Sequence, residues 1–580
     1  MDSRVANTSA ASSGAADSGA DRQFAALARD YLDDHARRHP ESATETGDHR
    51  FDAELGDLSA AALADERQAL GRYAARLAAL DAGALAPEHR VDAAMLASAV
   101  DLGVFQLDEL REHTWNPMLA NPGQAVYQLL ARDFAPVPER LAAVAGRLAA
   151  IPAALAAARA QLGDMPRVHL ETAITQFSGT ISLISGEIDA ALDRVPGSSA
   201  GLIGRVRPAA LAALEEHRAW LSARLAQAGA GGQPRIGAER FARKLSLTLA
   251  AAADADAILT RALADLDQVS EEISELAAEL AGPAAAARPW PARAAGDPDG
   301  DPAVREVLGR LGADAADNAT ILPFCRAALT QATDFVADTG LVTLYSDPVE
   351  VIEMPEIDRG VAVAYCDSPG PLEPASMPTF LAVSPAPADW PAERVASFYR
   401  EYNQHMVQNL IVHEAMPGHY LQLQHSRRFA GSATAVRATF RSGSFVEGWA
   451  VYAERLMAEH GYPGGGDPRA LRMQQLKMQL RMIINTILDA RVHGHGLTQA
   501  EAMALMTGRG YQEEGEAAGK WRRALLTSAQ LSTYYVGYTE VADLAADLAA
   551  ARGAGQRAVH DQMLAHGSPP ARLLRTLLLP

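Results

Sequence analysis

The sequence predicts a mainly α-helical fold, either a large helical bowl or a two-lobed helical domain with a deep cleft, and a small β-sheet near the candidate active site. The first observation is compositional. Alanine is abundant and aromatic residues make up only 6% of the 580 residues, which favours helices over sheets. The second is spacing, because apolar residues recur every three or four positions through stretches such as 140–162. The third is a β-rich segment at 341–385, which has helical patterns on both sides.

The chain begins with a segment of small and polar residues, 1–22. These residues cannot bury enough apolar surface to offset the entropy of ordering, so we expect a disordered tail. Residues 23–580 are expected to form a single, mostly helical domain. Its helical N-terminal lobe spans 23–338 and is interrupted at 282–302 by a loop rich in proline, glycine and alanine.

The sheet is expected within residues 341–385, where three β-rich runs are bounded by glycine and proline. They lie at 341–347, 360–367 and 379–385, and they predict two to four strands. The last run is the best candidate for an edge strand that pairs with an extended peptide. Helical patterns return at 390–580, the lobe that carries the motifs described below.

Charge and composition exclude several classes of partner. The formal net charge is −19, and such an acidic surface repels nucleic acid and anionic membranes. The two cysteines, Cys325 and Cys366, cannot form a disulfide framework. The N-terminus lacks the apolar segment of a secretory signal, and no run of about 18 apolar residues predicts a membrane span. Together these observations predict a cytoplasmic protein with no nucleic-acid or membrane partner.

A histidine–glutamate pair, His413 and Glu414, is followed by His419. In the common zinc-hydrolase motif H-E-x-x-H, both histidines ligate zinc from one helix face and the glutamate acts as general base. Here the histidines are six positions apart, which on a regular helix turns the second about 120° away from the first. Pro417 and Gly418 disrupt a regular helix, so we predict a widened turn or a helix end that brings His419 to the metal.

A catalytic zinc site needs a third protein ligand and one open position. The helical pattern FVEGWAVYAE begins 26 residues after His419 and carries two glutamates, Glu447 and Glu454. We predict that Glu447 is the third ligand. Glu454 lies seven residues later on the same helix face, where it would accept a hydrogen bond from a ligand histidine and orient it.

The two motifs in this order, HEAMPGHYLQ and then EGWAVYAE, resemble the bacterial domain-of-unknown-function-885 family. The motifs that carry the resemblance span roughly residues 340–545. Members of that family are mostly helical and look like zinc peptidases with a glutamate ligand. A more distant resemblance links the FVE segment to thimet-oligopeptidase-like peptidases, in which it supplies the glutamate ligand. That resemblance favours Glu447 over Glu454 and implies a helical bowl with zinc at the base of a deep channel.

Two further stretches match the family's patterns with local departures. DARVHGHGL keeps Asp489 and His493 but has Arg491 where glycine is usual and Leu497 where tryptophan is usual. SAQLSTYYVG keeps the family's glutamine as Gln530, its tyrosine as Tyr534 and its glycine as Gly537. Ser528 stands where the family has proline.

The candidate residues are given the following roles. Glu414 takes a proton from the metal-activated water and delivers it to the leaving amine. His493 and Tyr534 are the candidate donors to the developing oxyanion, with neighbouring Tyr535 as an alternative. Arg491 and Arg523 are candidates for binding a substrate carboxylate. For these residues the structural alternatives stay open: a structural histidine, a tyrosine packed in the core, and an arginine that is solvated or ion-paired.

The function predicted from these residues is a Zn²⁺-dependent hydrolase that cleaves a peptide or amide bond in a small substrate. A second hypothesis keeps the metal but assigns an amide in a specialised metabolite, because the replaced family positions allow a different pocket. A third hypothesis is a non-catalytic binding or scaffold protein with a degenerate site. It ranks last, because His413, Glu414, His419 and Glu447 are all present.

Overall fold

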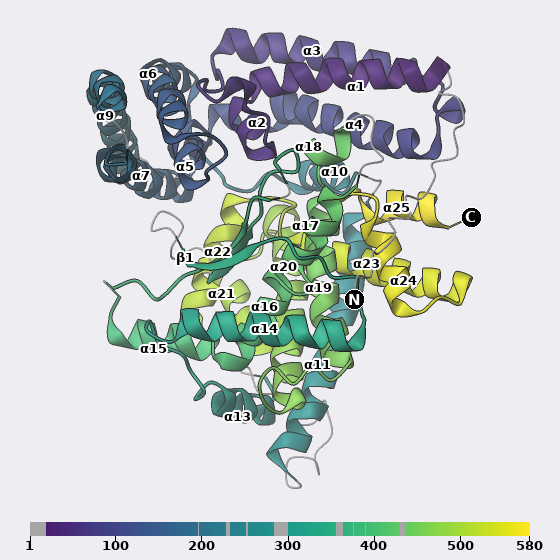
Figure 1. Ribbon diagram of the computed structural model, residues 1–580. Helices are drawn as coiled ribbons and strands as arrows, with labels where there is room; N and C mark the ends of the chain where they lie inside the picture. Colours follow the sequence, from purple (N-terminus) through teal and green to yellow (C-terminus); the bar gives the residue numbers. More distant parts are fainter. Residues whose placement is uncertain are drawn as a thin grey trace, which may run out of the picture.

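The structure is a computed structural model, and it confirms the mainly α-helical fold (Figure 1). It describes residues 19–194, 197–227, 232–250, 253–282, 300–354, 363–374, 376–388, 390–429 and 435–579. The first helix already begins at Gly19, so it includes the last four residues of the tail predicted at 1–22. The rest of that predicted tail lies outside the described residues.

The first helices form a layer along one side of the molecule, at the top of Figure 1. Their bounds are α1 (Gly19–Arg38), α2 (Pro40–Thr46), α3 (Ala60–Ala78) and α4 (Pro87–Phe105). Ser59 begins α3 by accepting a hydrogen bond from the Ala62 amide, as an N-cap serine does. Phe24, Leu27 and Leu96 from this layer are buried in one core.

The next five helices pack into a bundle beside that layer. They are α5 (Gly123–Ala131), α6 (Val137–Gln161), α7 (Arg167–Ser182), α8 (Ile188–Leu192) and α9 (Ser198–Gln227). By length and mean hydropathy alone, α6 also qualifies as a membrane span, although half of its most apolar window is buried inside the fold. It carries the fully buried Arg147, whose guanidinium donates to the Glu54 carbonyl at 3.1 Å. The core helix of a soluble protein passes the same test, so this single helix is weak support for a membrane partner.

A further core joins helices from the middle and from the C-terminal part of the chain. It contains α10 (Ala238–Thr248), α11 (Ala255–Ala281), α13 (Pro302–Leu311), α20 (Pro468–Gly494), α21 (Gln499–Ala504), α22 (Glu514–Leu526) and α23 (Ser532–Arg552). Ile273 of α11 and Leu480 of α20 are both fully buried in this core. Helices assigned by sequence to the N-terminal lobe therefore share a hydrophobic core with the helices after residue 390.

The fourth core lies between the sheet and the C-terminal helices. It is built from α14 (Ile321–Thr339), α15 (Ala392–Glu401), α16 (Gln404–Glu414), α17 (His419–Arg427), α19 (Gly443–Glu459), α23, α24 (Gln556–Leu564) and α25 (Ala571–Leu578). The short α18 (Val436–Thr439) packs against α4. Asn403, Ser442 and Asp467 accept backbone amide hydrogen bonds at the starts of α16, α19 and α20. Polar caps thus fix where the helices of the candidate site begin.

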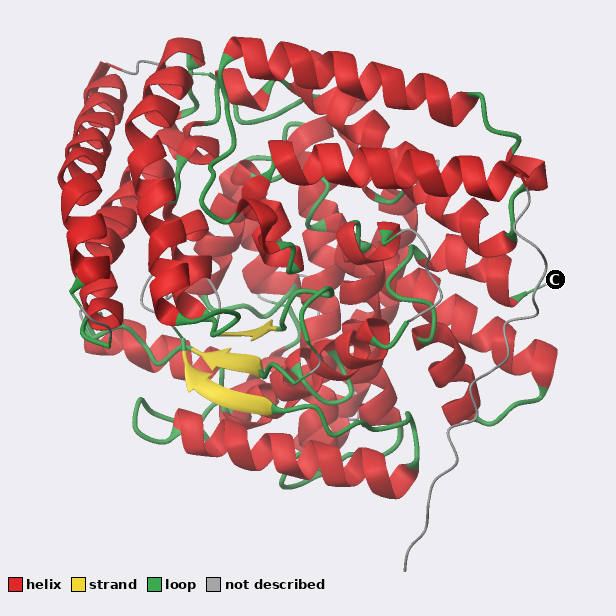
Figure 2. Cartoon of the chain, turned by 45° about the horizontal axis from the view of Figure 1, so that its top comes forward, coloured by secondary structure: helices red, strands yellow, loops and turns green. Residues whose placement is uncertain are grey.

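In the described residues the sheet has three strands, within the two to four expected, and helices surround it (Figure 2). The strands are β1 (Val349–Glu353), β2 (Ala364–Asp367) and β3 (Thr379–Val383). Their order is β1-β3-β2; β3 pairs parallel with β1 and antiparallel with β2. The predicted strand at 341–347 is wrong, because that segment is irregular and β1 follows it. The expected edge strand at 379–385 is also wrong, because β3 is central, and β2 is an edge instead.

Candidate metal centre

The two histidines of the motif lie at a break between helices. α16 ends at Glu414 and α17 begins at His419, so the residues between them are not helical. This interruption is what the six-residue spacing requires if both imidazoles are to face one point. The two rings lie with their centroids 4.7 Å apart and nearly perpendicular.

The break is held by a close backbone approach and by a side chain from α19. The Gly418 amide donates to the Val412 carbonyl at 3.0 Å, and a Cβ at Gly418 would overlap the His413 carbonyl. The Trp449 indole donates to the Pro417 carbonyl at 2.9 Å. The tryptophan of the EGW motif therefore fixes the segment that connects the two histidines.

Three candidate ligand atoms converge at this break. The Nε2 atoms of His413 and His419 each lie 3.5 Å from Oε2 of Glu447, and the three candidate ligand atoms lie within 4.8 Å of one another. Tetrahedral zinc with bonds of roughly 2.0–2.1 Å places its ligand atoms about 3.4 Å apart. Glu447 Oε2 is buried and has no hydrogen-bond partner in the described parts of the chain. A polar atom in this state fits a metal ligand, so these residues fit a zinc ion.

Glu454 contacts His413 as predicted. Its Oε1 lies 2.7 Å from His413 Nδ1, and its Oε2 accepts a hydrogen bond of 2.6 Å from the Asn409 amide. A carboxylate at Nδ1 leaves Nε2 of His413 free to ligate. Burial lowers the pKa of His413, but Glu447 and Glu454 outweigh it and hold that pKa well above its ordinary value. This surplus of negative charge suits a bound cation.

Glu414, the predicted general base, is positioned by the sheet. Its Oε2 accepts a hydrogen bond of 3.0 Å from the Cys366 amide of β2. Burial raises the pKa of Glu414, while the two histidine rings lower it. A carboxyl with a raised pKa beside candidate metal ligands can carry a proton between water and a leaving group.

Tyr534 comes to the cluster because two helices cross closely. Gly448 on α19 and Gly537 on α23 face each other, and a Cβ on either would overlap the backbone of the other helix. This contact brings the start of α23 beside Glu447. Burial and the Glu447 carboxylate raise the pKa of Tyr534, whose hydroxyl accepts a hydrogen bond of 3.3 Å from Arg523.

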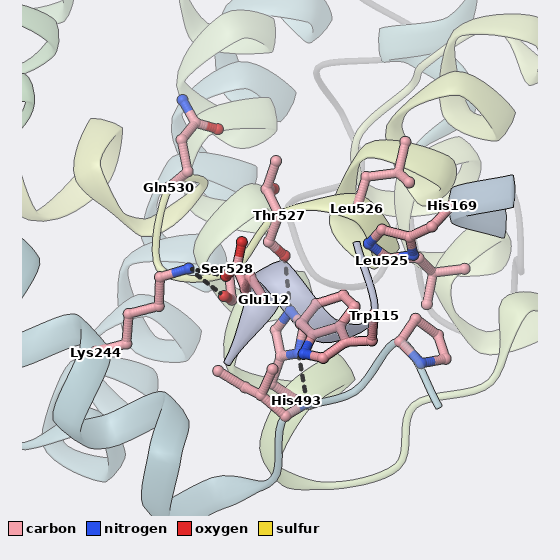
Figure 3. A pocket seen from close by; sticks show the side chains of 12 residues that line it. Glu112, Trp115, His169, Lys244, His493, Leu525, Leu526, Thr527, Ser528 and Gln530 are labelled. Carbon is pink, nitrogen blue, oxygen red and sulfur yellow. Dashed lines mark hydrogen bonds and ion pairs between the residues drawn. The ribbon is translucent and has the colours of Figure 1, made fainter. Parts of the chain in front are cut away.

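His493 does not join the cluster, which corrects its predicted catalytic role. Its Nε2 lies 2.9 Å from the Thr527 carbonyl, and its Nδ1 lies 3.4 Å from the Ile236 amide, so both ring nitrogens are engaged by backbone. Burial lowers its pKa to about 4. Figure 3 shows His493 lining a cavity of about 230 Å³ together with Glu112, Trp115, His169 and Lys244. The three candidate ligands do not line this cavity.

The residues of the DARVHGHGL stretch that match the family instead hold the chain segment just before Tyr534. Asp489, one turn before His493 on α20, accepts hydrogen bonds from the Ala529 amide at 3.1 Å, the Ser532 amide at 3.0 Å and the Ser532 hydroxyl at 2.8 Å. Together with the His493–Thr527 contact, these bonds fix the connection from α22 to α23. They set where α23 begins, two residues before Tyr534.

Two other candidates also lie elsewhere. The Tyr535 hydroxyl donates to Asp265 on α11 at 2.6 Å, which directs it away from Tyr534's side of α23. Arg491 lies near the end of α20, where it contributes, after Thr498, to lowering the pKa of Glu501. Neither has a described contact with the candidate ligands. Sequence reasoning missed Asn409 and Trp449. Trp449 lies within the EGW motif, and Asn409 lies one helical turn before His413.

Two solved structures match the chain along almost its whole length. One is described as "a putative lipoprotein of unknown function" from Shewanella oneidensis; it is 29% identical, covers 96% of this chain and 100% of its own, and has a TM-score of 0.78. The other is described as a "putative lipoprotein" from Colwellia psychrerythraea; it is 16% identical, covers 97% of this chain and 99% of its own, and has a TM-score of 0.77, a likeness of fold alone. No functionally curated protein matches the sequence.

These descriptions contradict the cytoplasmic location predicted from the sequence, because both matching proteins are described as lipoproteins. The prediction depends on the missing targeting signals and on the low cysteine content, and neither property determines a compartment. The family assignment rests on a longer match. The model of the bacterial proteins of unknown function DUF885 matches residues 40–578. The chain therefore belongs to the DUF885 family.

Proposed function

We propose that the protein is a zinc-dependent hydrolase that cleaves a peptide or amide bond, with Glu414 as general base. The observation that carries the proposal is the convergence of His413 Nε2, His419 Nε2 and Glu447 Oε2 at separations that suit a tetrahedral metal. The side chains of the cluster are not fully enclosed: that of Glu447 is 22% exposed and those of the histidines are 11% exposed.

A zinc ion in this site would supply Lewis acidity, polarising a carbonyl and making a water molecule more acidic. The chain's own residues would supply proton transfer and orientation. Glu414, held by the Cys366 amide, accepts the proton from water and passes it to the leaving nitrogen. The Tyr534 hydroxyl donates to the developing oxyanion, and its contact with Arg523 orients it.

Edge strand β2 gives the proposal a way to hold a peptide. Among the described residues the strand that pairs with β2 is β3, and the Cys366 amide of β2 is bonded to Glu414. A substrate in extended conformation that pairs along β2 would pass beside the general base. This placement favours a peptide over the second hypothesis, an amide in a specialised metabolite.

The proposal is tested with a library of short peptides and the purified, zinc-supplemented protein. Hydrolysis is expected in the unsubstituted protein, and it should disappear on chelation and return with added zinc. The Glu414→Gln variant should retain zinc but lose at least about a hundredfold in turnover, the scale of general-base catalysis. Hydrolysis that survives in Glu414→Gln would refute the assigned mechanism. Bound zinc with no activity on any peptide would favour the specialised amide.

A further inference from the structure

We propose that Lys520 and Arg523 form an anion subsite beside the metal cluster and bind a free carboxylate of the substrate. The inference rests on the proposed hydrolase function and names its substrate class: short peptides or N-acyl amino acids with a free C-terminal carboxylate.

The two cations lie on the same face of α22, three positions apart. The side chain of Arg523 reaches Tyr534, to whose hydroxyl it donates at 3.3 Å. Lys520 is buried, with 6% of the residue exposed, and it is within electrostatic reach of the ligand Glu447. Arg523 therefore contacts a residue that would act on the scissile bond, and Lys520 lies one helical turn from Arg523 on the same helix.

Within the described ranges neither cation has an acidic partner, because no carboxylate oxygen there lies within 4.0 Å of the Lys520 amine or the Arg523 guanidinium. The side-chain partners of Arg523 are neutral: Gln530 Oε1 at 2.8 Å and the Tyr534 hydroxyl. The chain has 71 acidic and only 52 basic residues, so cations left without acidic partners call for a specific reason.

Besides the candidate ligand Glu447, the carboxylate near Lys520 in the described residues is Glu516. Glu516 is already engaged, because it forms an ion pair with Arg481 and accepts a hydrogen bond of 3.2 Å from Tyr402. Burial and the neighbouring Arg481 and Arg523 hold the pKa of Lys520 well below its ordinary value. A buried amine in this environment gains a favourable partner when an anion binds.

The geometry of the pair favours a carboxylate. The guanidinium of Arg523 binds planar carboxylates in a bidentate manner, and the amine of Lys520 adds a point charge. Because the pair lies next to Tyr534 and within reach of Glu447, a carboxylate held there places the cleaved amide only one or two residues from the chain end. The protein should therefore remove residues from a free C-terminus or cleave N-acyl amino acids.

The subsite is tested by calorimetric binding to zinc-loaded Glu414→Gln protein, which binds without turnover. The probes are N-acetylated dipeptides, each in matched forms that end in a free carboxylate or in an amide. The free acids should bind at least tenfold more tightly than the amides. Adding Lys520→Met or, separately, Arg523→Gln should reduce this ratio to threefold or less at unchanged zinc content. Lys244→Met serves as control, because that amine contacts Glu112 and Ser528 in the separate cavity (Figure 3) and should leave the ratio unchanged.

Equal binding of acids and amides, or no binding of any acid, would overturn the subsite. A preference that persists in both Lys520→Met and Arg523→Gln would overturn its assignment to these residues. The first comparison needs no substitution in α22, so it holds even if one variant does not fold. Failure of the proposed function has a different signature: a preserved preference for carboxylates with no hydrolysis by the unsubstituted protein.

Discussion

Single residues around the cluster divide into candidate ligands and the groups that orient them. Glu454 is the clearest orienting group, because one of its oxygens contacts His413 and the other is held by Asn409. His419 has no equivalent support, since its Nδ1 is buried without a hydrogen-bond partner in the part of the chain that the structure describes. The orientation of the centre therefore depends mainly on the His413–Glu454 contact.

Replacing Glu454 with glutamine should weaken zinc binding about 10- to 100-fold, the usual effect of losing a partner of a ligand histidine. Competition with a chromophoric chelator measures the affinity. Glu459→Gln is a matched control on the same helix, because that carboxylate forms a surface ion pair with Arg455. Equal zinc affinity in the Glu454→Gln and unsubstituted proteins would contradict the orienting role.

Replacing Tyr534 with phenylalanine should lower kcat by about 10²–10³-fold while KM and zinc content change little, as expected for a donor that acts in the transition state. Steady-state kinetics on the best library peptide measures both constants. Tyr535→Phe should retain kcat, because its hydroxyl contacts Asp265. The opposite result, a loss in Tyr535→Phe alone, would exchange the roles of the two tyrosines.

The residue types of the HE and EGW segments are enough to predict the candidate ligands and Glu454, and the FVE resemblance supplies the preference for Glu447 as the ligand. The sequence does not distinguish a donor such as Tyr534 from a positioning residue such as His493. Both residues match the family's patterns. Only the folded structure shows that the His493 ring contacts backbone groups, the Thr527 carbonyl and the Ile236 amide. Lys520 belongs to no motif, and only the folded structure shows that it has no acidic partner among the described residues.

At the scale of elements, the site depends on the broken helix α16–α17 and on the crossing of α19 and α23. The break puts both imidazoles on one side, and the crossing brings Glu447 and Tyr534 together. Glycines occur where the backbones meet, because no side chain fits between Gly448 and Gly537. The small residues of the EGW and YVG segments are therefore required by packing.

Replacing Gly537 with alanine should destabilise the protein by about 1–3 kcal/mol or more, the cost of overpacking a tight contact, and should reduce zinc occupancy. Gly309→Ala is the control, because that helical glycine on α13 has open space around its Cβ position. The control should be neutral or gain up to about 1 kcal/mol from helix propensity. Thermal unfolding of both variants tests this, and equal melting temperatures would contradict the crossing.

The small sheet shows where sequence patterns fail for elements. The runs at 360–367 and 379–385 contain strands, but β-rich residues at 341–347 form irregular chain, because strand formation depends on a pairing partner. Strand order also escapes a local pattern: β3 has the most apolar run because it is central, not because it offers an edge. Edge strand β2 is short, and part of its predicted run, 360–362, lies outside the described residues.

At the scale of the whole molecule, buried histidines make stability depend on pH. His217 in the α5–α9 bundle is fully buried between Phe177 and Trp220, and burial lowers its pKa to about 4. Its neutral form is favoured in the folded state, so the unfolded chain binds more protons between pH 6.5 and 4. The contribution of neutral His217 to the free energy of unfolding is complete above pH 6.5, and it is lost as the pH falls towards 4.

The His217→Phe variant should remove this acid sensitivity. The free energy of unfolding of the variant minus that of the unsubstituted protein should be about 2–3 kcal/mol more positive near pH 4.5 than near pH 7. Denaturant unfolding of both proteins at a series of pH values measures the effect. Parallel stability curves across that range would contradict the buried neutral histidine.

The helical character of the molecule follows directly from composition and spacing, and the fold confirms it. The packing of segments distant in sequence does not follow from either property. α11 was grouped with the N-terminal helices, yet it packs along α20 in a shared core. Helices with similar apolar stripes can pack in several arrangements, and only tertiary contacts choose among them.

The central claim, a metal centre of His413, His419 and Glu447, is tested most directly by metal stoichiometry. Elemental analysis of the zinc-supplemented, dialysed protein should give about one zinc per chain. His419→Ala should lose it, whereas His425→Ala, which removes a buried histidine on the same helix that contacts the Thr343 carbonyl, should retain it. No stoichiometric zinc in the unsubstituted protein, or full occupancy in His419→Ala, would contradict the centre.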